Sequence, residues 1–444
     1  MTEPSVPSAP TRKDRAIAKI AALLAAAVYR EVDVHRAAAQ PVAGPQLSIS
    51  NHFGGLSDGI VLLYSLPRRP GIIARDVIWK IPVAGRMMTW IGGIPVHQPE
   101  DGGGSSNDQM FSSCYDALRD GRHLLIFPEG ITRDHPSIGR VKTGAARIAL
   151  GAQASGTGGL VVTPVGIHYE DKAALRSRVV VIGGAPIEID TLVPRSETGE
   201  PLGPDDRAAV EALTSRFDID LRRVAPDYED WREARRLQTA AEVTLRSCQD
   251  DPHIAVSIGQ RDRLANALAD RPPERRRAIC DAVERYDADL DGLGSDDATF
   301  SGRIGSRRVL ASLLLQALVG LLLLPFAVAG ALLNLVPFLV VKAVGRLRVS
   351  PAVLASAKPA VAVLAFGITW GIEVWAAGRA FGLTGVAAAI VLIPTYGIAT
   401  VVVFERIVLM WRLVSRWRAT ARSRRFVEQL AGGRAAVVEA VFAS

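Results

Sequence analysis

The stretch Leu47–Leu66, LSISNHFGGLSDGIVLLYSL, decides the fold. Its first residues alternate apolar and small polar side chains as a strand does. A Gly-Gly pair interrupts that pattern, and from Ile60 onward the apolar residues recur at helical spacing. The stretch therefore predicts a strand, a turn and a helix, with His52 and Asp58 on the turn.

His52 and Asp58 have the layout of a general base and the group that orients it. A neutral imidazole takes a proton from a substrate hydroxyl near pH 7. A carboxylate on its other nitrogen fixes the tautomer and stabilises the imidazolium. Such a pair needs no covalently modified side chain. From the residues alone, the alternative is a turn histidine near a helix N-cap aspartate.

The same stretch also matches a serine-hydrolase elbow, because residues 55–59 have the form G-x-S-x-G. In an elbow the serine follows its strand at once, whereas Ser57 lies seven residues beyond Ser50. A serine lipase built on Ser57 is therefore the alternative from a different class of protein.

Strands and helices alternate over residues 31–194. The apolar runs predict further strands at 30–35, 71–75, 94–96, 124–127, 161–168 and 178–182, with helices at 79–90, 110–118 and 142–150. This alternation predicts an α/β domain whose mostly parallel sheet is covered by helices on both faces.

A second group of polar residues follows the predicted strand 124–127, in the segment Phe127–Arg133. Ligands of open α/β sheets bind at the ends of strands. Backbone amides around Gly130, together with Arg133 and Lys142, are suited to hold a phosphate. The alternative is a plain exit from strand to turn with a solvated arginine.

The chain has 444 residues and a formal charge of +7, and its basic residues cluster beside apolar segments. This arrangement favours anionic lipid surfaces and not a nucleic-acid partner, which would require a basic stripe with interleaved aromatics. Cys114, Cys248 and Cys280 lack the spacing of a disulfide framework or a zinc site. We therefore expect a reducing, cytosol-facing compartment and no metal.

Residues 1–30 place Arg15, Lys19 and Arg30 at helical spacing around the apolar run 20–28. This pattern predicts an amphipathic helix lying on a membrane surface. A cleaved signal peptide, favoured by the small residues near the end of the run, is the alternative.

Residues 195–308 are rich in charged residues and predict a soluble helical region, with helices at 205–225, 231–249, 256–270 and 273–285. Residues 287–292 copy the first half of a calcium-binding EF-hand loop. Ala298, however, stands at position twelve, which requires a bidentate glutamate. We therefore expect an acidic loop at 287–292 and no calcium.

Residues 309–413 predict a membrane region. The stretch Val309–Val341 is uncharged, while 359–377 and 383–404 are each long enough to span a bilayer with about 20 apolar residues. Glu373 lies inside the second of these stretches. It is either a functional carboxylate within the membrane or one that reaches the interface.

The first of these stretches contains residues expected to divide it into a re-entrant pair, namely Pro325, Asn334 and Pro337. Basic residues flank the apolar stretches, and the basic tail 414–444 follows them. By the positive-inside rule, the basic linkers and the soluble ends face the cytoplasm.

Several short motifs, in this order and spacing, resemble the glycerolipid acyltransferase family, which includes the acylglycerol-phosphate and glycerol-3-phosphate O-acyltransferases. They are Asn51-His52 with Asp58, then Gly93–Val96, Phe127–Gly130, Lys142–Ala146 and Thr163–Val165. The resemblance covers residues 25–190. It is nearest to the branch that acts on glycerol-3-phosphate or dihydroxyacetone phosphate.

The resemblance implies a role for individual residues. It makes His52 the base that deprotonates the acceptor hydroxyl and Asp58 its partner. It also implies that Glu129 and Gly130 shape the acceptor site and that Pro164 closes the pocket.

The resemblance further implies an O-acyl transfer in phospholipid synthesis without a cofactor. Acyl-CoA or acyl carrier protein is the co-substrate, glycerol-3-phosphate or a lysophospholipid is the acceptor, and membrane lipids surround the enzyme. Two alternatives remain. One is an acyltransferase for a different lipid acceptor, and the other is a catalytically silent membrane scaffold.

Two departures from the family pattern bear on the site. Five residues separate His52 from Asp58, where the commonest pattern has four. Gln98 stands where the family usually has the arginine that contacts the acceptor phosphate. The positive charge for that phosphate is therefore expected from Arg75, Arg133, Lys142 or His97.

Overall fold

The computed structural model describes residues 11–36, 43–97, 107–172, 174, 176–195, 197, 199–249, 256–291, 297, 306–347, 349, 351–420 and 424–443. The chain divides into two compact units, Met1–Trp231 with Ser350–Ser356 and Arg232–Val349 with Ala357–Ser444.

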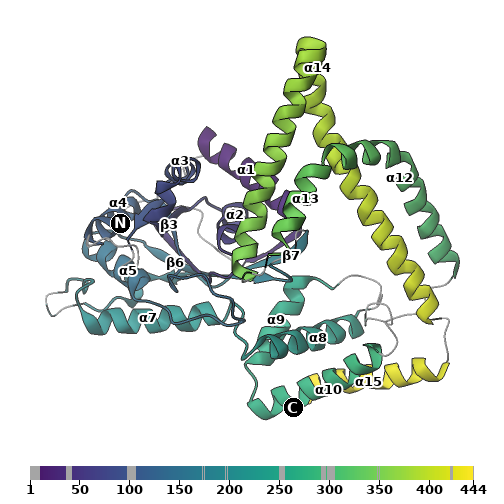
Figure 1. Cartoon of the computed structure of the whole chain (residues 1–444). Helices are drawn as coiled ribbons and strands as arrows, with labels where there is room; N and C mark the ends of the chain where they lie inside the picture. The colour runs from purple at the N-terminus through teal and green to yellow at the C-terminus, as the bar shows by residue number, and fades with distance from the viewer. Residues whose placement is uncertain are drawn as a thin grey trace. The chain divides into compact units, whose positions relative to one another are not determined.

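The first unit is built on an eight-stranded sheet (Figure 1). Its strands are β1 (Tyr29–Arg36), β2 (Gln46–Ser50), β3 (Gly71–Arg75), β4 (Ile94–Val96), β5 (His123–Ile126), β6 (Val161–Tyr169), β7 (Ser177–Gly183) and β8 (Ile187–Glu188). They lie in the order β1-β7-β6-β2-β5-β3-β4, and β8 pairs with β6. All pairs are parallel except those of β6 with β7 and β8. The prediction of a mostly parallel sheet is confirmed.

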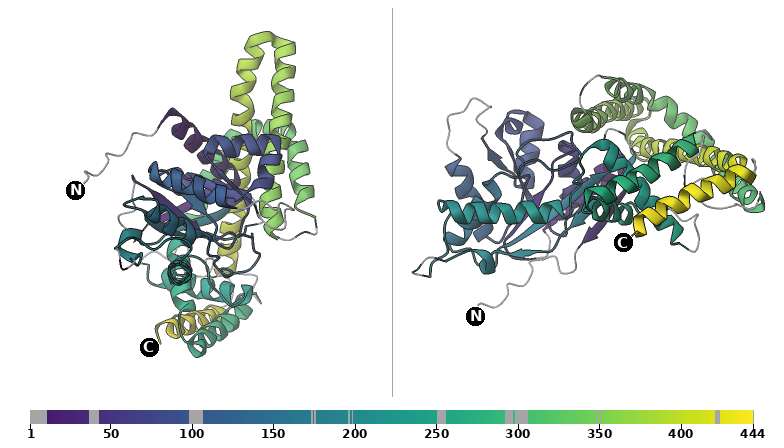
Figure 2. Two further views of the ribbon diagram at one scale, coloured as in Figure 1. Left: turned by 90° about the vertical axis from the view of Figure 1, so that its left-hand side faces the viewer. Right: turned by 90° about the horizontal axis from the view of Figure 1, so that it is seen from below.

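Helices cover both faces of this sheet, as predicted (Figures 1 and 2). They are α1 (Arg12–Val28), α2 (Leu56–Ser65), η1 (Asp76–Lys80), α3 (Pro82–Ile91), α4 (Asp108–Arg119), α5 (Gly144–Ala154), α6 (Ile189–Leu192) and α7 (Arg207–Arg222). Residues of α1, α2 and α3 share one buried cluster with β5, β6 and β7. Helices α4, α5 and α7 lie over the other face (Figure 1). This packing fixes the edges of the sheet on which the candidate site lies.

Helix α1 is amphipathic. It begins with a capping box between Thr11 and Asp14, and it buries one face, which includes Ile17, within the cluster under α2. On its outer face Ile20 and Leu23 are 47% and 71% exposed. Such a face is suited to a lipid surface, and the membrane contact of residues 1–30 stays a prediction.

Among the described residues of the second unit, the helices outside the apolar region are α8 (Trp231–Ser247), α9 (Ile258–Ala269), α10 (Pro273–Asp291) and α15 (Arg424–Phe442). Helix α15 packs along α10. Helix α10 continues to Asp291, so the expectation of an acidic loop from residue 287 is wrong. The reason is that Tyr286 and Leu290 extend the buried face of the helix. No cluster able to hold a metal ion occurs among the residues that the structure describes, and Ala298 lies outside them.

The apolar region forms α12 (Ser306–Leu333), α13 (Leu335–Val344) and α14 (Pro351–Thr420). Helix α14 is interrupted at Gly382, whose φ is 62° and ψ −151°, and the chain reverses there to form a hairpin (Figure 1). Of the three expected breaks in the first stretch, only Asn334 separates two helices. The expected breaks at Pro325 and Pro337 are wrong, since both prolines lie inside helices. Apolar helices tolerate proline because neighbouring groups satisfy the freed backbone carbonyl.

Two segments in the described part of the chain are long and apolar enough to cross a membrane, Leu310–Leu333 and Ala357–Trp411. Only 17% of the most apolar window in each is buried. The core helix of a soluble protein would be mostly buried, so these segments expose their apolar surface in the way a membrane helix does.

Candidate active site

His52 and Asp58 meet at the carboxyl end of β2. Strand β2 ends at Ser50, and α2 begins at Leu56 after Gly55, whose φ is 61°. This turn brings the Nδ1 atom of His52 to 2.7 Å from Oδ2 of Asp58. The imidazole Nδ1–H therefore donates to the carboxylate. The ring Nε2 has no hydrogen-bond partner among the described residues.

Asp58 is fully buried and lies in the first turn of α2. Its Oδ1 and Oδ2 accept from the Gly54 amide at 3.1 and 2.9 Å, and Oδ1 also accepts from the Tyr169 hydroxyl at 2.5 Å. Gly55 occupies the N-cap position, so Asp58 is not the N-cap of the helix. A buried carboxylate with these donors has one rigid orientation toward His52.

Glu129 lies directly under the backbone of His52. Its Oε1 accepts from the His52 amide at 3.0 Å, and its Oε2 accepts from the Gly139 amide at 2.8 Å. Burial raises the pKa of Glu129, and the two amide hydrogen bonds oppose that rise. The His52 ring also stacks on Phe127 with its centroid 4.2 Å away. Glu129 thus ties the loop after β5 to the loop after β2.

Arg133 and Lys142 belong to the same loop after β5, which contacts the His52 backbone. The Arg133 amide donates to the His52 carbonyl at 3.1 Å. The Arg133 guanidinium lies against Gly139, and Lys142 Nζ lies beside Gly130, which has a φ of 68°. The structure therefore brings two cations to the edge that carries the histidine.

Arg75 and His97 lie further along the same edge. Arg75 ends β3, and β5 separates β3 from β2, so the two strands lie about 10 Å apart at a strand spacing of about 4.8 Å. His97 follows β4, one strand further out, and its Nδ1 lies 3.0 Å from Oδ2 of Asp76. Gln98 lies outside the described residues.

Pro164 is placed differently from the other predicted residues. It is buried within β6, in register with Ile49 of the neighbouring β2. Its predicted role in closing the pocket stays a prediction.

Sequence reasoning missed the contacts that β6 makes with the turn. The Asn51 side chain donates to the Ile167 carbonyl at 3.0 Å and accepts from the Ile167 amide at 2.7 Å. Tyr169, two residues further on, reaches Asp58. These partners lie more than a hundred residues away along the chain, so no local pattern contains them.

Ser57 does not occupy the position of a nucleophile. Its residue is 2% exposed, and its side chain is hydrogen-bonded to Tyr29. His52 directs Nδ1 to Asp58. Because a nucleophilic serine has to face the substrate and pass its proton to a base, this placement argues against a serine lipase.

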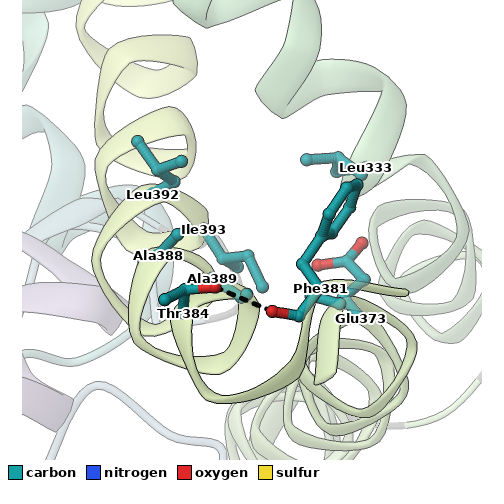
Figure 3. Close-up of a pocket in the computed structure, with 10 residues that line it drawn as sticks. Leu333, Glu373, Phe381, Thr384, Ala388, Ala389, Leu392 and Ile393 are labelled. Carbon is teal, nitrogen blue, oxygen red and sulfur yellow. Dashed lines mark hydrogen bonds between the residues drawn. The ribbon is translucent and has the colours of Figure 1, made fainter. Parts of the chain in front are cut away.

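The second unit contains a cavity of about 550 Å³ (Figure 3). Its lining includes Leu333, Glu373, Phe381, Thr384, Leu392 and Ile393. The Oε2 atom of Glu373 is buried and has no hydrogen-bond partner among the described residues. Glu373 is the only titratable group in this lining, so the cavity lacks the acid–base pair present at the sheet edge.

The chain is similar to known acyltransferases. Residues 31–168 match the family model described as Acyltransferase. Over 146 residues, or 31% of this chain, the sequence is 36% identical to glycerol-3-phosphate O-acyltransferase 2 of Saccharomyces cerevisiae and covers 19% of that protein. The 1-acyl-sn-glycerophosphate (LPA) acyltransferase PlsC from Thermotoga maritima superposes with a TM-score of 0.34 at 19% identity, covering 47% of this chain and 79% of that one.

The site defines an α/β domain with a histidine–aspartate pair at the carboxyl edge of its sheet. Residues 31–168, which contain this pair, match the Acyltransferase model, and the resemblance to the glycerolipid acyltransferase family given by the motifs is confirmed. The chain spans about a fifth of the length of its yeast relative.

Proposed function

We propose that this protein is a membrane-bound O-acyltransferase of phospholipid synthesis. It moves a fatty acyl group from acyl-CoA or acyl carrier protein to glycerol-3-phosphate or a lysophosphatidate-type acceptor. The observation that carries the proposal is the hydrogen bond between His52 Nδ1 and Asp58, which leaves the ring Nε2 to face substrate. No cofactor enters the reaction.

The chemistry is a direct transfer. The acceptor hydroxyl gives its proton to Nε2 of His52 as its oxygen bonds to the thioester carbonyl carbon. Asp58 stabilises the imidazolium that results. The tetrahedral oxyanion then collapses, the carbon–sulfur bond breaks, and the imidazolium returns the proton to the thiolate. The products are an ester and a free thiol.

The acceptor phosphate requires positive charge near His52. Arg133 and Lys142 lie on the loop that bonds the His52 backbone, whereas Arg75 lies about two strand spacings away. We assign the phosphate to Arg133 and Lys142, with the backbone around Gly130 between them. Similarity to a glycerol-3-phosphate O-acyltransferase supports an acceptor of this kind.

The test is a panel assay on membranes that contain the full chain. Labelled acyl-CoA or acyl carrier protein is offered with glycerol-3-phosphate, dihydroxyacetone phosphate and lysophospholipids. We expect transfer to one of these acceptors. In His52→Ala the rate should fall by roughly 10²-fold or more, which is the usual contribution of a positioned base.

The matched control is His35→Ala. His35 is also paired with an aspartate, since its Nε2 lies 2.9 Å from Oδ2 of Asp33, but it lies on β1 at the far side of the sheet. This variant is expected to keep the wild-type rate. An undiminished rate in His52→Ala would contradict the proposed mechanism. Absence of thiol release with every acceptor would favour the silent scaffold.

The same proposal includes a multi-pass arrangement with the acyltransferase domain on the cytoplasmic side. Helix α13 has 10 residues and a length of about 15 Å, too short to cross a hydrocarbon core of about 30 Å. We therefore assign α12 and α13 to a re-entrant pair. Helix α14 crosses twice, with Gly382 at the far side.

Cysteine labelling tests this arrangement in sealed vesicles with the cytoplasmic face inside. Leu383, which is 88% exposed next to Gly382, is replaced by cysteine, and Arg346→Cys serves as the matched position on the basic linker. We expect an impermeant thiol reagent to label Leu383→Cys and to reach Arg346→Cys only after permeabilisation. Equal labelling before permeabilisation contradicts the topology.

A further inference from the structure

Asp58 has a second partner on the side away from His52. The Tyr169 hydroxyl donates to Oδ1 of Asp58 at 2.5 Å, while His52 donates to Oδ2 at 2.7 Å. Tyr169 is the last residue of β6, the strand next to β2. The carboxylate therefore lies between the histidine and a tyrosine from another strand.

A second tyrosine lies behind the first. Tyr29 follows α1 directly, is 3% exposed, and its side chain hydrogen-bonds Tyr169. The ring centroids are 6.0 Å apart. Burial raises the pKa of Tyr29 to about 12 and the pKa of Tyr169 well above its usual value. Both hydroxyls thus keep their protons at neutral pH, and Tyr169 remains a donor.

The Asp58–Tyr169 contact leaves no room for a side chain at position 54. A Cβ atom at Gly54 would lie 2.8 Å from both Asp58 Oδ1 and the Tyr169 hydroxyl. The Asn51 side chain fastens the turn to Ile167 of the same strand β6. Strand β6 therefore holds both ends of the turn, one through Asn51 and one through Tyr169.

We propose that Tyr169 is a positioning residue for the acyl-transfer reaction, acting on His52 through Asp58, with Tyr29 holding Tyr169 in place. This inference rests on the proposed function of the His52–Asp58 pair. A donor on Oδ1 keeps the carboxylate plane aligned with the ring and takes up part of its negative charge.

Loss of the Tyr169 hydroxyl is expected to shift the pH dependence of the rate in one direction. The charged and titratable groups facing this region are Asp58, Glu129, Arg133 and the two tyrosines. Without the hydroxyl, more negative charge faces the Nδ1–H of His52 and favours the protonated ring, which cannot accept a proton. The acid limb of the rate profile therefore moves to higher pH.

The experiment compares Tyr169→Phe with wild type in the acyl-transfer assay from pH 5 to 9. We expect kcat to fall roughly tenfold at neutral pH with KM little changed. The acid limb of the profile should shift to higher pH by about half a unit or more, because hydrogen bonds to charged groups are the strong ones. Tyr29→Phe is expected to move both quantities in the same direction by less. Tyr64→Phe, an exposed tyrosine on α2, is the matched control.

A second readout needs no substrate. Diethyl pyrocarbonate modifies the unprotonated imidazole of His52, and peptide mass spectrometry follows its rate against pH. The pH at the midpoint of this modification profile is expected to rise in Tyr169→Phe. This measurement remains informative even if no acceptor is found and the proposed function fails. A lower melting temperature with both pH profiles unmoved would overturn the inference. If Tyr169→Phe does not accumulate, the profiles of Tyr29→Phe decide.

Discussion

Two histidines at opposite edges of one sheet have different surroundings. At the carboxyl edge His52 keeps 20% of its side chain exposed and bonds Asp58 through one nitrogen. At the amino edge His123, the first residue of β5, is 5% exposed and uses both nitrogens. Its Nε2 lies 2.9 Å from the Ser48 hydroxyl, and its Nδ1 lies 2.8 Å from the Arg68 carbonyl.

The difference supports the proposed catalytic role of His52 and a structural role for His123. His123 has both of its hydrogen bonds and is closed to solvent, and burial lowers its pKa to about 4, so it stays neutral and structural. His52 has one fixed bond and one ring nitrogen without a partner among the described residues. A general base needs this combination, because one nitrogen has to be oriented while the other stays open to accept a proton.

The largest expected effect is that of Asp58→Asn on catalysis. An amide cannot accept from every donor around Asp58, and it removes the charge that stabilises the imidazolium. We expect kcat to fall roughly 10²-fold, as in His52→Ala, because Asp58 acts on the reaction through His52. The measurement is the initial rate of acyl transfer with the acceptor found in the panel assay.

Asp33→Asn is the control for this change, because Asp33 pairs with His35 on β1 in a second histidine–aspartate pair. It is expected to leave kcat within twofold of wild type. A comparable loss in both variants would mean that the carboxyl edge has no special role.

The turn at the carboxyl edge could be predicted from sequence because its signals are local. Alternation before Ser50, the glycines after it and the apolar spacing from Ile60 gave the strand, turn and helix that the structure contains. The His52–Asp58 bond follows from that turn. The predicted strands and helices of the first unit also agree with the structure to within a few residues.

Other parts of the site could not be predicted, because they depend on strand order and on distant contacts. Arg75 and His97 follow strands as expected, but the order β2-β5-β3-β4 places them away from His52. Tyr169 and Asn51 act across the contact between β2 and β6, which no local periodicity encodes. Likewise the helical end of α10 arose from packing of its buried face and not from its acidic residues.

At the amino edge, we expect His123 to make the free energy of unfolding depend on pH. Its pKa is about 4 in the folded protein against 6.5 for an ordinary histidine, so the unfolded chain binds a proton first as pH falls. The contribution of neutral His123 to the free energy of unfolding is complete above pH 6.5 and is lost progressively toward pH 4. The loss amounts to about 3 kcal/mol. Thermal unfolding of unit 1, followed by tryptophan fluorescence, measures it. In His123→Gln this part of the pH dependence should vanish, while acyl transfer at pH 7 by the folded protein is retained.

The smallest effect is expected from Glu129→Gln, which tests whether the carboxyl edge also contains purely structural bonds. Both Glu129 oxygens accept from backbone amides, those of His52 and Gly139. Glutamine keeps one carbonyl oxygen as an acceptor and puts an –NH₂ donor in place of the other oxygen, so one buried backbone amide loses its partner. We expect the unfolding free energy to fall by about 1–3 kcal/mol.

Because the lost bond holds the loop of His52, kcat should fall as well. Restoration of kcat at a lower temperature would indicate that Glu129 acts through that loop. Unchanged stability would show that neither amide depends on the carboxylate.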